Sequence, residues 1–210
     1  MVLVPAYGID SSQVRRLFER REAPLRTLAG TADQVARTCH AMSLRFHRGG
    51  KLVVFGNGGP STDAQHLAVE FVHPVIVGKR ALPAISLTSD VATLTGIAND
   101  KGIDEVFAHQ IDYLAEPADI ALGLSSDGNC GNVLRGLREA RDRGLLTIGM
   151  VGAGGGSVAA EPGLDHVLIA DSPDPRVVKE VHVTTYHILW ELVHVFFERP
   201  GVLPPAVMTG

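Results

Sequence analysis

The sequence predicts an α/β fold, a three-layer doubly wound parallel sheet with an N-terminal helical segment. Two observations lead to this fold class. Short apolar runs alternate with longer stretches of helical periodicity from residue 52 to residue 198. Glycine or small polar residues follow two of these runs, where strands of a parallel sheet would end and helices begin. Such an alternation buries a parallel sheet between two layers of helices.

The order of elements follows from the same periodicity. Residues 11–27 are charged, with apolar residues at helical spacing, and residues 32–46 carry an apolar stripe that ends before Gly49 and Gly50. The later apolar runs predict strands at 52–55, 84–87, 120–124, 147–151 and 167–169. Helices are expected at 61–73, 90–98, 104–114, 131–143 and 175–198. The segment 152–156, Gly-Ala-Gly-Gly-Gly, predicts a loop whose glycines serve the backbone conformation.

Length and composition suit one α/β domain with a helical extension, since the chain has 210 residues, 45% of them hydrophobic. We expect the extension at 1–30, the main domain at 31–200 and a tail at 201–210. The net charge of -4 does not favour nucleic acid or membrane surfaces, and no apolar run reaches the roughly 18 residues of a membrane helix. We therefore expect neither as a partner. Cys39 and Cys130 lack metal-like spacing, and the N-terminus does not resemble a secretory signal, which indicates a cytoplasmic protein.

Two turns are candidates for ligand binding. The first apolar run ends at the turn 56–59, Gly-Asn-Gly-Gly, and a helical pattern follows. Glycines let a backbone approach a ligand closely, and the N–H groups of a helix start lack intrahelical partners. The turn therefore suits an anion or a sugar. The turn 125–129, Ser-Ser-Asp-Gly-Asn, repeats the arrangement after a later strand. One such turn is as easily structural as functional, whereas two in one parallel sheet favour ligand binding.

The helix after the first turn carries polar side chains on one face. At spacings of three, four and three, these are Asp63, His66, Glu70 and His73. A solvated face has the same pattern, but this helix begins at the glycine turn and borders the expected pocket. On the C-terminal helix, His187 could complete a two-histidine, one-carboxylate set with His66 and Glu70, which suits zinc. A histidine on so apolar a helix is more often a core residue, so both interpretations stay open.

With these residues considered together, the chain resembles the sugar isomerase (SIS) domain, and within that superfamily the phosphoheptose isomerase (sedoheptulose 7-phosphate isomerase) family. The similarity extends from about residue 32 to residue 197. It rests on the first turn with Asp63-Ala64-Gln65-His66 and Glu70, on Pro83-Ala84-Ile85, on Ala98-Asn99-Asp100, on the second turn with Asn132-Val133-Leu134, and on Glu180-Val181-His182 with Tyr186-His187-Ile188-Leu189. The resemblance implies a SIS-type, flavodoxin-like sheet. It also implies a homotetramer whose active sites are built from more than one subunit.

The family interconverts a ketose phosphate and an aldose phosphate through an enediol. This proton transfer needs a base near both carbons and an acid for the oxygen. By resemblance, Glu70 is the base and His187 the partner acid/base, and His66, Glu70 and His187 match positions that bind zinc in some members. The resemblance also implies that the substrate is bound by Asn57, Gly58, Gly59, Ser61, Asp100, Ser125, Ser126 and Asn129. The implied function is an aldose–ketose isomerase of a sugar phosphate, most of all sedoheptulose 7-phosphate.

Several positions differ from the family pattern. Pro60 replaces the serine that usually follows the first turn, and Asp127 and Cys130 replace hydroxyl residues of the phosphate-binding loop. A carboxylate there would repel a phosphate dianion. Lys179 replaces a glutamine that completes the metal shell in some members, and a charged lysine is a poor zinc ligand. Two alternatives therefore stay open: a non-catalytic SIS protein that binds a sugar or acts as a regulator, and an isomerase of a different, unphosphorylated sugar.

Overall fold

A five-stranded parallel sheet lies at the centre of the computed structural model, which describes residue 8 and residues 10–204. Its strands are β1 (Leu52–Gly56), β2 (Ala84–Ser86), β3 (Ile120–Ser125), β4 (Leu146–Gly152) and β5 (His166–Ala170). The strand order is β2-β1-β3-β4-β5, and every neighbouring pair is parallel. This order confirms the predicted doubly wound, flavodoxin-like sheet. In such a sheet the winding reverses between β1 and β3, and ligands bind beyond the carboxyl ends of the strands at that point.

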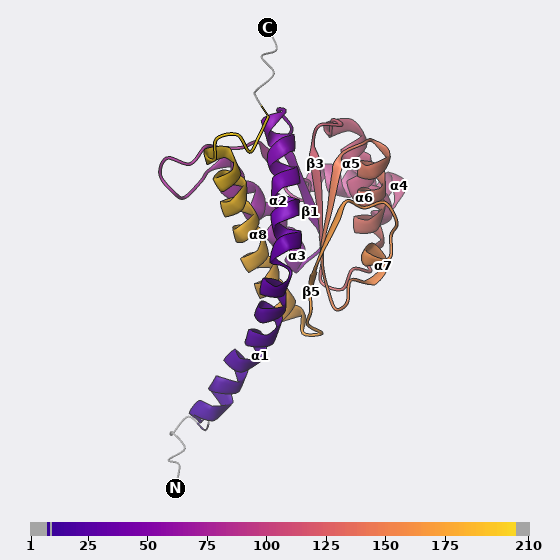
Figure 1. Cartoon of the computed structure of the whole chain (residues 1–210). Coiled ribbons are helices and arrows are strands. Elements are labelled where there is room, and N and C mark those ends of the chain that lie inside the picture. Colours follow the sequence, from indigo (N-terminus) through magenta and orange to yellow (C-terminus); the bar gives the residue numbers. More distant parts are fainter. Residues whose placement is uncertain (1–7, 9, 205–210) are drawn as a thin grey trace.

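Helices cover both faces of the sheet (Figure 1). One layer contains α2 (Ala32–His47), α3 (Gly59–Val72) and α8 (Pro175–Glu198). The other layer contains α4 (Val91–Lys101), the 3₁₀ turn η1 (Ile103–Glu105), α5 (Val106–Leu114), α6 (Gly131–Asp142) and the short α7 (Gly156–Ala159). Alternate residues of each strand supply the two cores. In β1, Leu52 and Val54 belong to the first core, and Val53 and Phe55 to the second.

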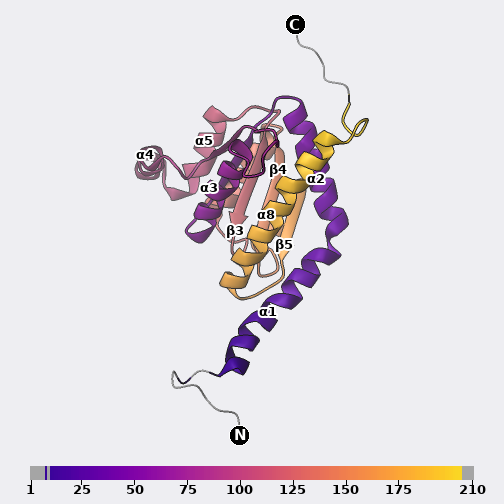
Figure 2. The same ribbon diagram turned by 90° about the vertical axis from the view of Figure 1, so that its left-hand side faces the viewer.

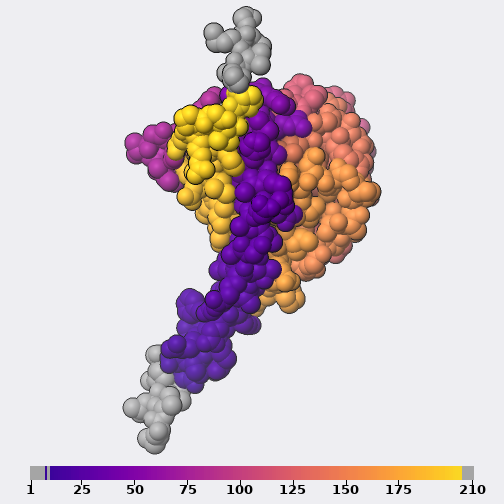
Figure 3. All heavy atoms as spheres, viewed as in Figure 1, coloured from indigo at the N-terminus to yellow at the C-terminus, as the bar shows by residue number. Residues whose placement is uncertain are grey.

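Helix α1 (Ser11–Gly30) extends away from the sheet and its helical layers (Figures 1 and 3). It contacts α8 through Arg21, whose guanidinium donates hydrogen bonds of 2.6 and 2.9 Å to the carboxylate of Glu180. The expected N-terminal helical segment is therefore present, whereas the division into domains stays a prediction. Residues 1–7 and 9 of the expected extension and residues 205–210 of the expected tail lie outside the described residues. No helix among residue 8 and residues 10–204 combines the length and apolar composition needed to span a bilayer.

The glycine-rich loop after β4 has the backbone conformation that its sequence predicted. Gly154, Gly155 and Gly156 have φ values of 83°, 91° and 51°, in the left-handed region where a Cβ is strained. Gly156 also begins α7, which the sequence analysis missed because four residues are too few for a helical period to be visible. The conformation of the loop lets it lie against the second turn, where Val158 donates a main-chain hydrogen bond to Gly128.

Replacing Gly128 with alanine should therefore destabilise the fold. Gly128 has a φ of +73°, and an added Cβ would lie 1.9 Å from the carbonyl oxygen of Gly155. Left-handed backbone strain of about 1–2 kcal/mol and overpacking of about 1–3 kcal/mol should lower the free energy of unfolding, measured by urea titration. The control Gly154→Ala shares the positive φ but has no atom within 4 Å of the added Cβ. Equal losses in the two variants would contradict this account.

Candidate active site

Helices α3 and α8 lie side by side on one face of the sheet (Figure 2), and three side-chain contacts set their register. Each contact joins one residue of α3 to one of α8: Lys179 Nζ donates to Asp63 Oδ1 at 2.5 Å, the Tyr186 hydroxyl lies 2.7 Å from His66 Nδ1, and Trp190 Nε1 donates to the main-chain oxygen of Glu70 at 2.8 Å. The contacts advance in the same order along both helices. The two helices therefore run in the same direction, and the contacts cover about two turns of α3 and about three turns of α8.

This register brings His66, Glu70 and His187 together. One possible ligand atom from each residue lies within 4.8 Å of the other two. His66 Nε2 lies 3.2 Å from Glu70 Oε1, and the rings of His66 and His187 meet edge to face with centroids 5.3 Å apart. The side chain of Glu70 is 12% exposed and that of His66 is 43% exposed. A largely buried carboxylate thus faces two imidazoles at a place open to solvent.

The three side chains fit a divalent cation. Two imidazoles and a carboxylate are a donor set found in zinc sites, and sites with three protein ligands keep a position for water or substrate. Lys179 does not belong to this set. Its ammonium contacts Asp63 Oδ1 at 2.5 Å, and Gly59 O and Thr62 Oγ1 at 3.2 Å each. An ammonium has three donors and no lone pair, so all three donors of Lys179 are occupied at the start of α3, and Lys179 has no lone pair to offer a metal ion.

The first glycine turn forms the start of α3. Gly58 is the N-cap, with a φ of 60° that glycine adopts without strain, and Gly59 is the first helical residue. Pro60 follows within the first turn, where its missing N–H would have had no intrahelical partner. The Ser61 hydroxyl donates to Gly58 O at 2.6 Å. Pro60 therefore serves the helix start and leaves the neighbouring N–H groups in place.

Asn57 holds the first turn against the neighbouring strand connection. It exchanges two hydrogen bonds with the buried Asn132 of α6, at 2.6 and 3.1 Å. This pair joins the segment after β1 to the segment after β3, at the point where the winding of the sheet reverses. Asn57, Gly58 and Ser61 line a cavity of about 280 Å³ that also reaches α4 and α5.

The second turn is largely satisfied by its own hydrogen bonds. Ser125 is 1% exposed, and its hydroxyl accepts from Gly128 N at 2.9 Å and donates to Asp127 Oδ1 at 3.2 Å. Asp127 Oδ1 also accepts from Asn129 N at 2.9 Å, and Asn129 Oδ1 accepts from the main chain and hydroxyl of Ser157. The carboxylate that replaces a hydroxyl residue is thus the acceptor that organises the turn. Within the described part of the chain, Ser126 makes no side-chain hydrogen bond.

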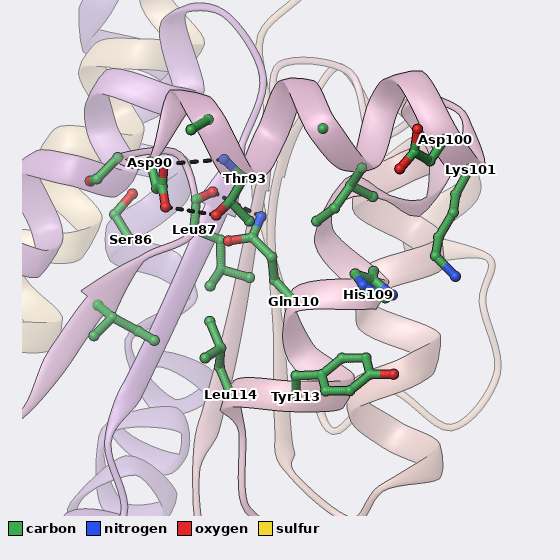
Figure 4. Close-up of a pocket in the computed structure, with 15 residues that line it drawn as sticks. Ser86, Leu87, Asp90, Thr93, Asp100, Lys101, His109, Gln110, Tyr113 and Leu114 are labelled. Carbon is green, nitrogen blue, oxygen red and sulfur yellow. Dashed lines mark hydrogen bonds between the residues drawn. The ribbon is translucent and has the colours of Figure 1, made fainter.

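Asp100 lies apart from both turns. It occupies the C-terminal end of α4 and lines a cavity of about 750 Å³ together with Lys101, His109 and Tyr113 (Figure 4). Glu70 and His187 line another cavity, of about 410 Å³. Asp100, the Glu70–His187 pair and the first turn therefore line three different cavities.

The sequence analysis assigned no individual role to Tyr186, Trp190 or Asn132. Each holds a predicted site residue in place through a hydrogen bond. Tyr186 and Trp190 are four apart on the apolar C-terminal helix, and both are aromatic residues with a polar tip. That combination is a signal for a buried hydrogen bond, but the partner depends on which helix lies alongside.

Comparisons with known proteins place the chain in a family. The SIS domain family matches residues 18–152. A phosphoheptose isomerase from Desulfovibrio desulfuricans is 40% identical over 205 residues, which cover 97% of this chain and 92% of that protein. One from Solidesulfovibrio magneticus is 41% identical over 204 residues, covering 97% and 94%. The chain belongs to the SIS domain family and, within it, to the phosphoheptose isomerase family.

Solved structures of family members have the same fold. The phosphoheptose isomerase from Francisella tularensis superposes with a TM-score of 0.82 at 28% identity, covering 89% of this chain and 100% of that one. The one from Neisseria gonorrhoeae gives a TM-score of 0.79 at 28% identity, covering 87% and 97%. The family and fold class predicted from the sequence motifs are thus confirmed.

Removing the ammonium of Lys179 should leave the Asp63 carboxylate buried without its cation. The Asp63 side chain is 5% exposed, and that of Lys179 is 43% exposed. Breaking a buried ion pair costs about 3–5 kcal/mol, and partial exposure should reduce the loss in Lys179→Met to about 2–3 kcal/mol of unfolding free energy in urea. The double variant D63N/K179M should recover much of this loss, because no charge stays buried. Unchanged stability in the single variant would show that the ion pair does not hold α3 to α8.

His182 should make the stability of the protein depend on pH. It is 2% exposed, and burial lowers its pKa. The imidazole is therefore neutral in the folded protein, and the unfolded chain binds more protons below the ordinary pKa of about 6.5. The contribution of neutral His182 to the free energy of unfolding should be fully present above about pH 6.5. It should fall by up to about 1.4 kcal/mol per pH unit as the pH decreases toward the lowered pKa that His182 has in the folded protein. Urea titrations between about pH 8 and about pH 5.5 test this, and His182→Gln should show a smaller decrease. Equal decreases in both proteins would exclude His182 as the cause.

Proposed function

We propose that this protein is an aldose–ketose isomerase that interconverts sedoheptulose 7-phosphate and a heptose 7-phosphate through an enediol. The observation that carries the proposal is the convergence of His66, Glu70 and His187 from two helices at one solvent-open place. Moving a proton between adjacent carbons requires a base and an acid close together, which Glu70 and His187 supply. Relatives at 40–41% identity that are named phosphoheptose isomerase support the choice of substrate.

In this proposal Glu70 moves the carbon-bound proton and His187 the oxygen-bound proton. Glu70 takes a proton from carbon 1 of the ketose, and His187 gives a proton to the carbonyl oxygen on carbon 2, which forms the enediol. His187 then takes the proton of the hydroxyl on carbon 1, and Glu70 returns its proton to carbon 2, which yields the aldose. The low exposure of the Glu70 side chain, 12%, limits the access of competing water.

The same proposal includes a zinc ion, held by His66, Glu70 and His187 through two imidazole nitrogens and one carboxylate oxygen. When bound, zinc supplies positive charge that stabilises negative oxygens of an enediolate. With three protein ligands, such a site would keep a coordination position for water or substrate. Lys179 is held on the first turn of α3 and adds no fourth protein ligand.

The substrate phosphate is proposed to bind between the first turn, where α3 begins, and the second turn, which the family resemblance implies as a phosphate-binding loop. Gly58 and Gly59 carry main-chain N–H groups at the positive end of the helix dipole, beside Asn57 and Ser61. The nearby ammonium of Lys179 adds a cation on the same turn. In the same proposal, the substrate is also contacted by Ser125, Ser126, Asn129 and Asp100.

We infer that other copies of the chain, in a homotetramer, complete each active site. The cavity at Asn57 and Ser61 is lined by neither Glu70 nor His187, and Asp100 lines another. Contributions from different copies would bring these groups to one substrate. Exposed apolar residues, with Phe18 at 69% and Val77 at 100%, offer surface for such contacts. A cytoplasmic location, supported by two free cysteines, is part of this inference.

A second candidate is a non-catalytic SIS protein that binds a sugar without converting it, or an isomerase of an unphosphorylated sugar. Asp127 favours these alternatives, because its carboxylate lies within the second turn. At about 4 Å and an effective dielectric of about 20, each pair of like unit charges costs roughly 4 kcal/mol. The choice between the candidates therefore depends on whether proton exchange occurs on a phosphorylated substrate.

Replacing Glu70 with glutamine should abolish the proton transfer while the protein stays folded. We expect exchange of solvent deuterium into the carbon next to the carbonyl of sedoheptulose 7-phosphate, followed by NMR, to fall by about 10²–10⁴-fold. The control Glu116→Gln changes an exposed glutamate outside the site and should exchange as the unmodified protein does. Undiminished exchange in Glu70→Gln would remove Glu70 as the base. Sugar binding without exchange in the unmodified protein would favour the non-catalytic alternative.

A further inference from the structure

The hydroxyl of Tyr186 contacts the ring nitrogen of His66 that does not face Glu70. Tyr186 Oη lies 2.7 Å from His66 Nδ1, whereas His66 Nε2 lies 3.2 Å from Glu70 Oε1. The Tyr186 and His66 rings meet edge to face, with centroids 5.4 Å apart and an interplanar angle of 82°. Tyr186 is 0% exposed, whereas the His66 side chain is 43% exposed. A fixed hydroxyl thus holds one nitrogen of a partly exposed imidazole whose other nitrogen faces the site.

We propose that Tyr186 is a positioning residue, whose hydroxyl keeps the Nε2 lone pair of His66 directed toward Glu70 and His187. The inference rests on the proposed function of this site. A neutral imidazole has one N–H and one lone pair. If Nε2 presents its lone pair to a cation, Nδ1 must carry the hydrogen, and this hydrogen needs an acceptor. The Tyr186 oxygen is placed to accept it.

A hydroxyl suits this position because it can both donate and accept a hydrogen bond. Without a cation, the Tyr186 O–H donates to Nδ1, and the Nε2–H donates to Glu70 Oε1. With a cation at Nε2, the Nδ1–H donates to the Tyr186 oxygen, and Glu70 is released from His66. Only hydrogen atoms change place between the two arrangements, so the side chains can stay in their packed positions.

A tyrosine hydroxyl is ordinarily protonated at neutral pH, so Tyr186 keeps a hydrogen that needs an acceptor of its own. Within the described part of the chain, Asp63 Oδ2 is buried without a hydrogen-bond partner. It is therefore a candidate acceptor for the hydroxyl hydrogen when Nδ1 becomes the donor. Asp63 would then serve both the ion pair with Lys179 and the orientation of His66.

The zinc affinity of Tyr186→Phe tests the proposal, because this variant loses only the hydroxyl. We expect its zinc dissociation constant, measured by competition with a chromogenic chelator at neutral pH, to rise about 10–100-fold. The control Tyr113→Phe loses an exposed hydroxyl on α5, where the residue is 74% exposed, and should bind zinc as the unmodified protein does. Equal affinity in the two variants would overturn the proposal, and so would an unmodified protein that binds no zinc.

A second measurement needs no change at Tyr186. In the zinc-loaded protein labelled with ¹⁵N-histidine, the signals of His66, assigned by their absence in His66→Gln, should show a protonated Nδ1 and a coordinated Nε2. Coordination through Nδ1 would overturn the proposal. Neither readout uses isomerase activity. Zinc binding as expected with no proton exchange on the sugar would contradict the proposed function and leave the role of Tyr186 standing. Normal proton exchange in the unmodified protein, together with unaltered zinc affinity in Tyr186→Phe, would contradict the role of Tyr186 and leave the proposed function standing.

Discussion

The pairing of α3 with α8 is the constraint on which the candidate site depends. His66 and Glu70 share a helix face because they are four residues apart, but His187 comes from a helix more than a hundred residues later. The ion pair of Lys179 with Asp63, the Tyr186–His66 contact and the Trp190 hydrogen bond to Glu70 fix how the second helix lies along the first. A slip by one turn would move His187 by about 5.4 Å and separate the three side chains. The packing of α8 against α3 therefore determines the geometry of the candidate site.

The charge at the start of α3 shows how the chain uses a residue that differs from the family pattern. Burying a carboxylate such as that of Asp63 without a partner is costly. Lys179 removes this cost by placing its ammonium on Asp63 and on two further oxygens of the same turn. The position that could have supplied a metal ligand thus stabilises the helix pair instead. The consequence is a donor set of three residues with an open side, and a cation next to the proposed phosphate site.

The sequence predicted those features whose cause is local, and missed those that depend on packing. Five apolar runs were sufficient for the sheet, and the spacing of His66 and Glu70 was sufficient for their shared face. The partnership of α3 with α8 has no local signal, so the residue pattern offered His187 only as a candidate for the set, and its role as partner acid/base came from the family resemblance. The Asp127 carboxylate was expected to repel a phosphate dianion, and the structure shows that it also accepts hydrogen bonds from its own turn, beside Gly128 and the Ser125 hydroxyl. The placement of Asp100 depends on packing in the same way, because its cavity is formed by β2, α4 and α5 and is lined by neither glycine turn.

The dimensions of α3 bear on how one substrate could meet all the proposed groups. Gly59 begins the helix and Glu70 lies eleven residues later, so at 1.5 Å per residue they are separated by roughly 16 Å along the axis. With bond lengths of about 1.5 Å, a seven-carbon sugar and its phosphate span no more than roughly 10 Å. A phosphate at the start of α3 therefore holds its carbonyl end short of Glu70 in the same chain. The proposed sharing of an active site between copies, in which the glycine turn of one copy serves the Glu70–His187 pair of another, would remove this mismatch.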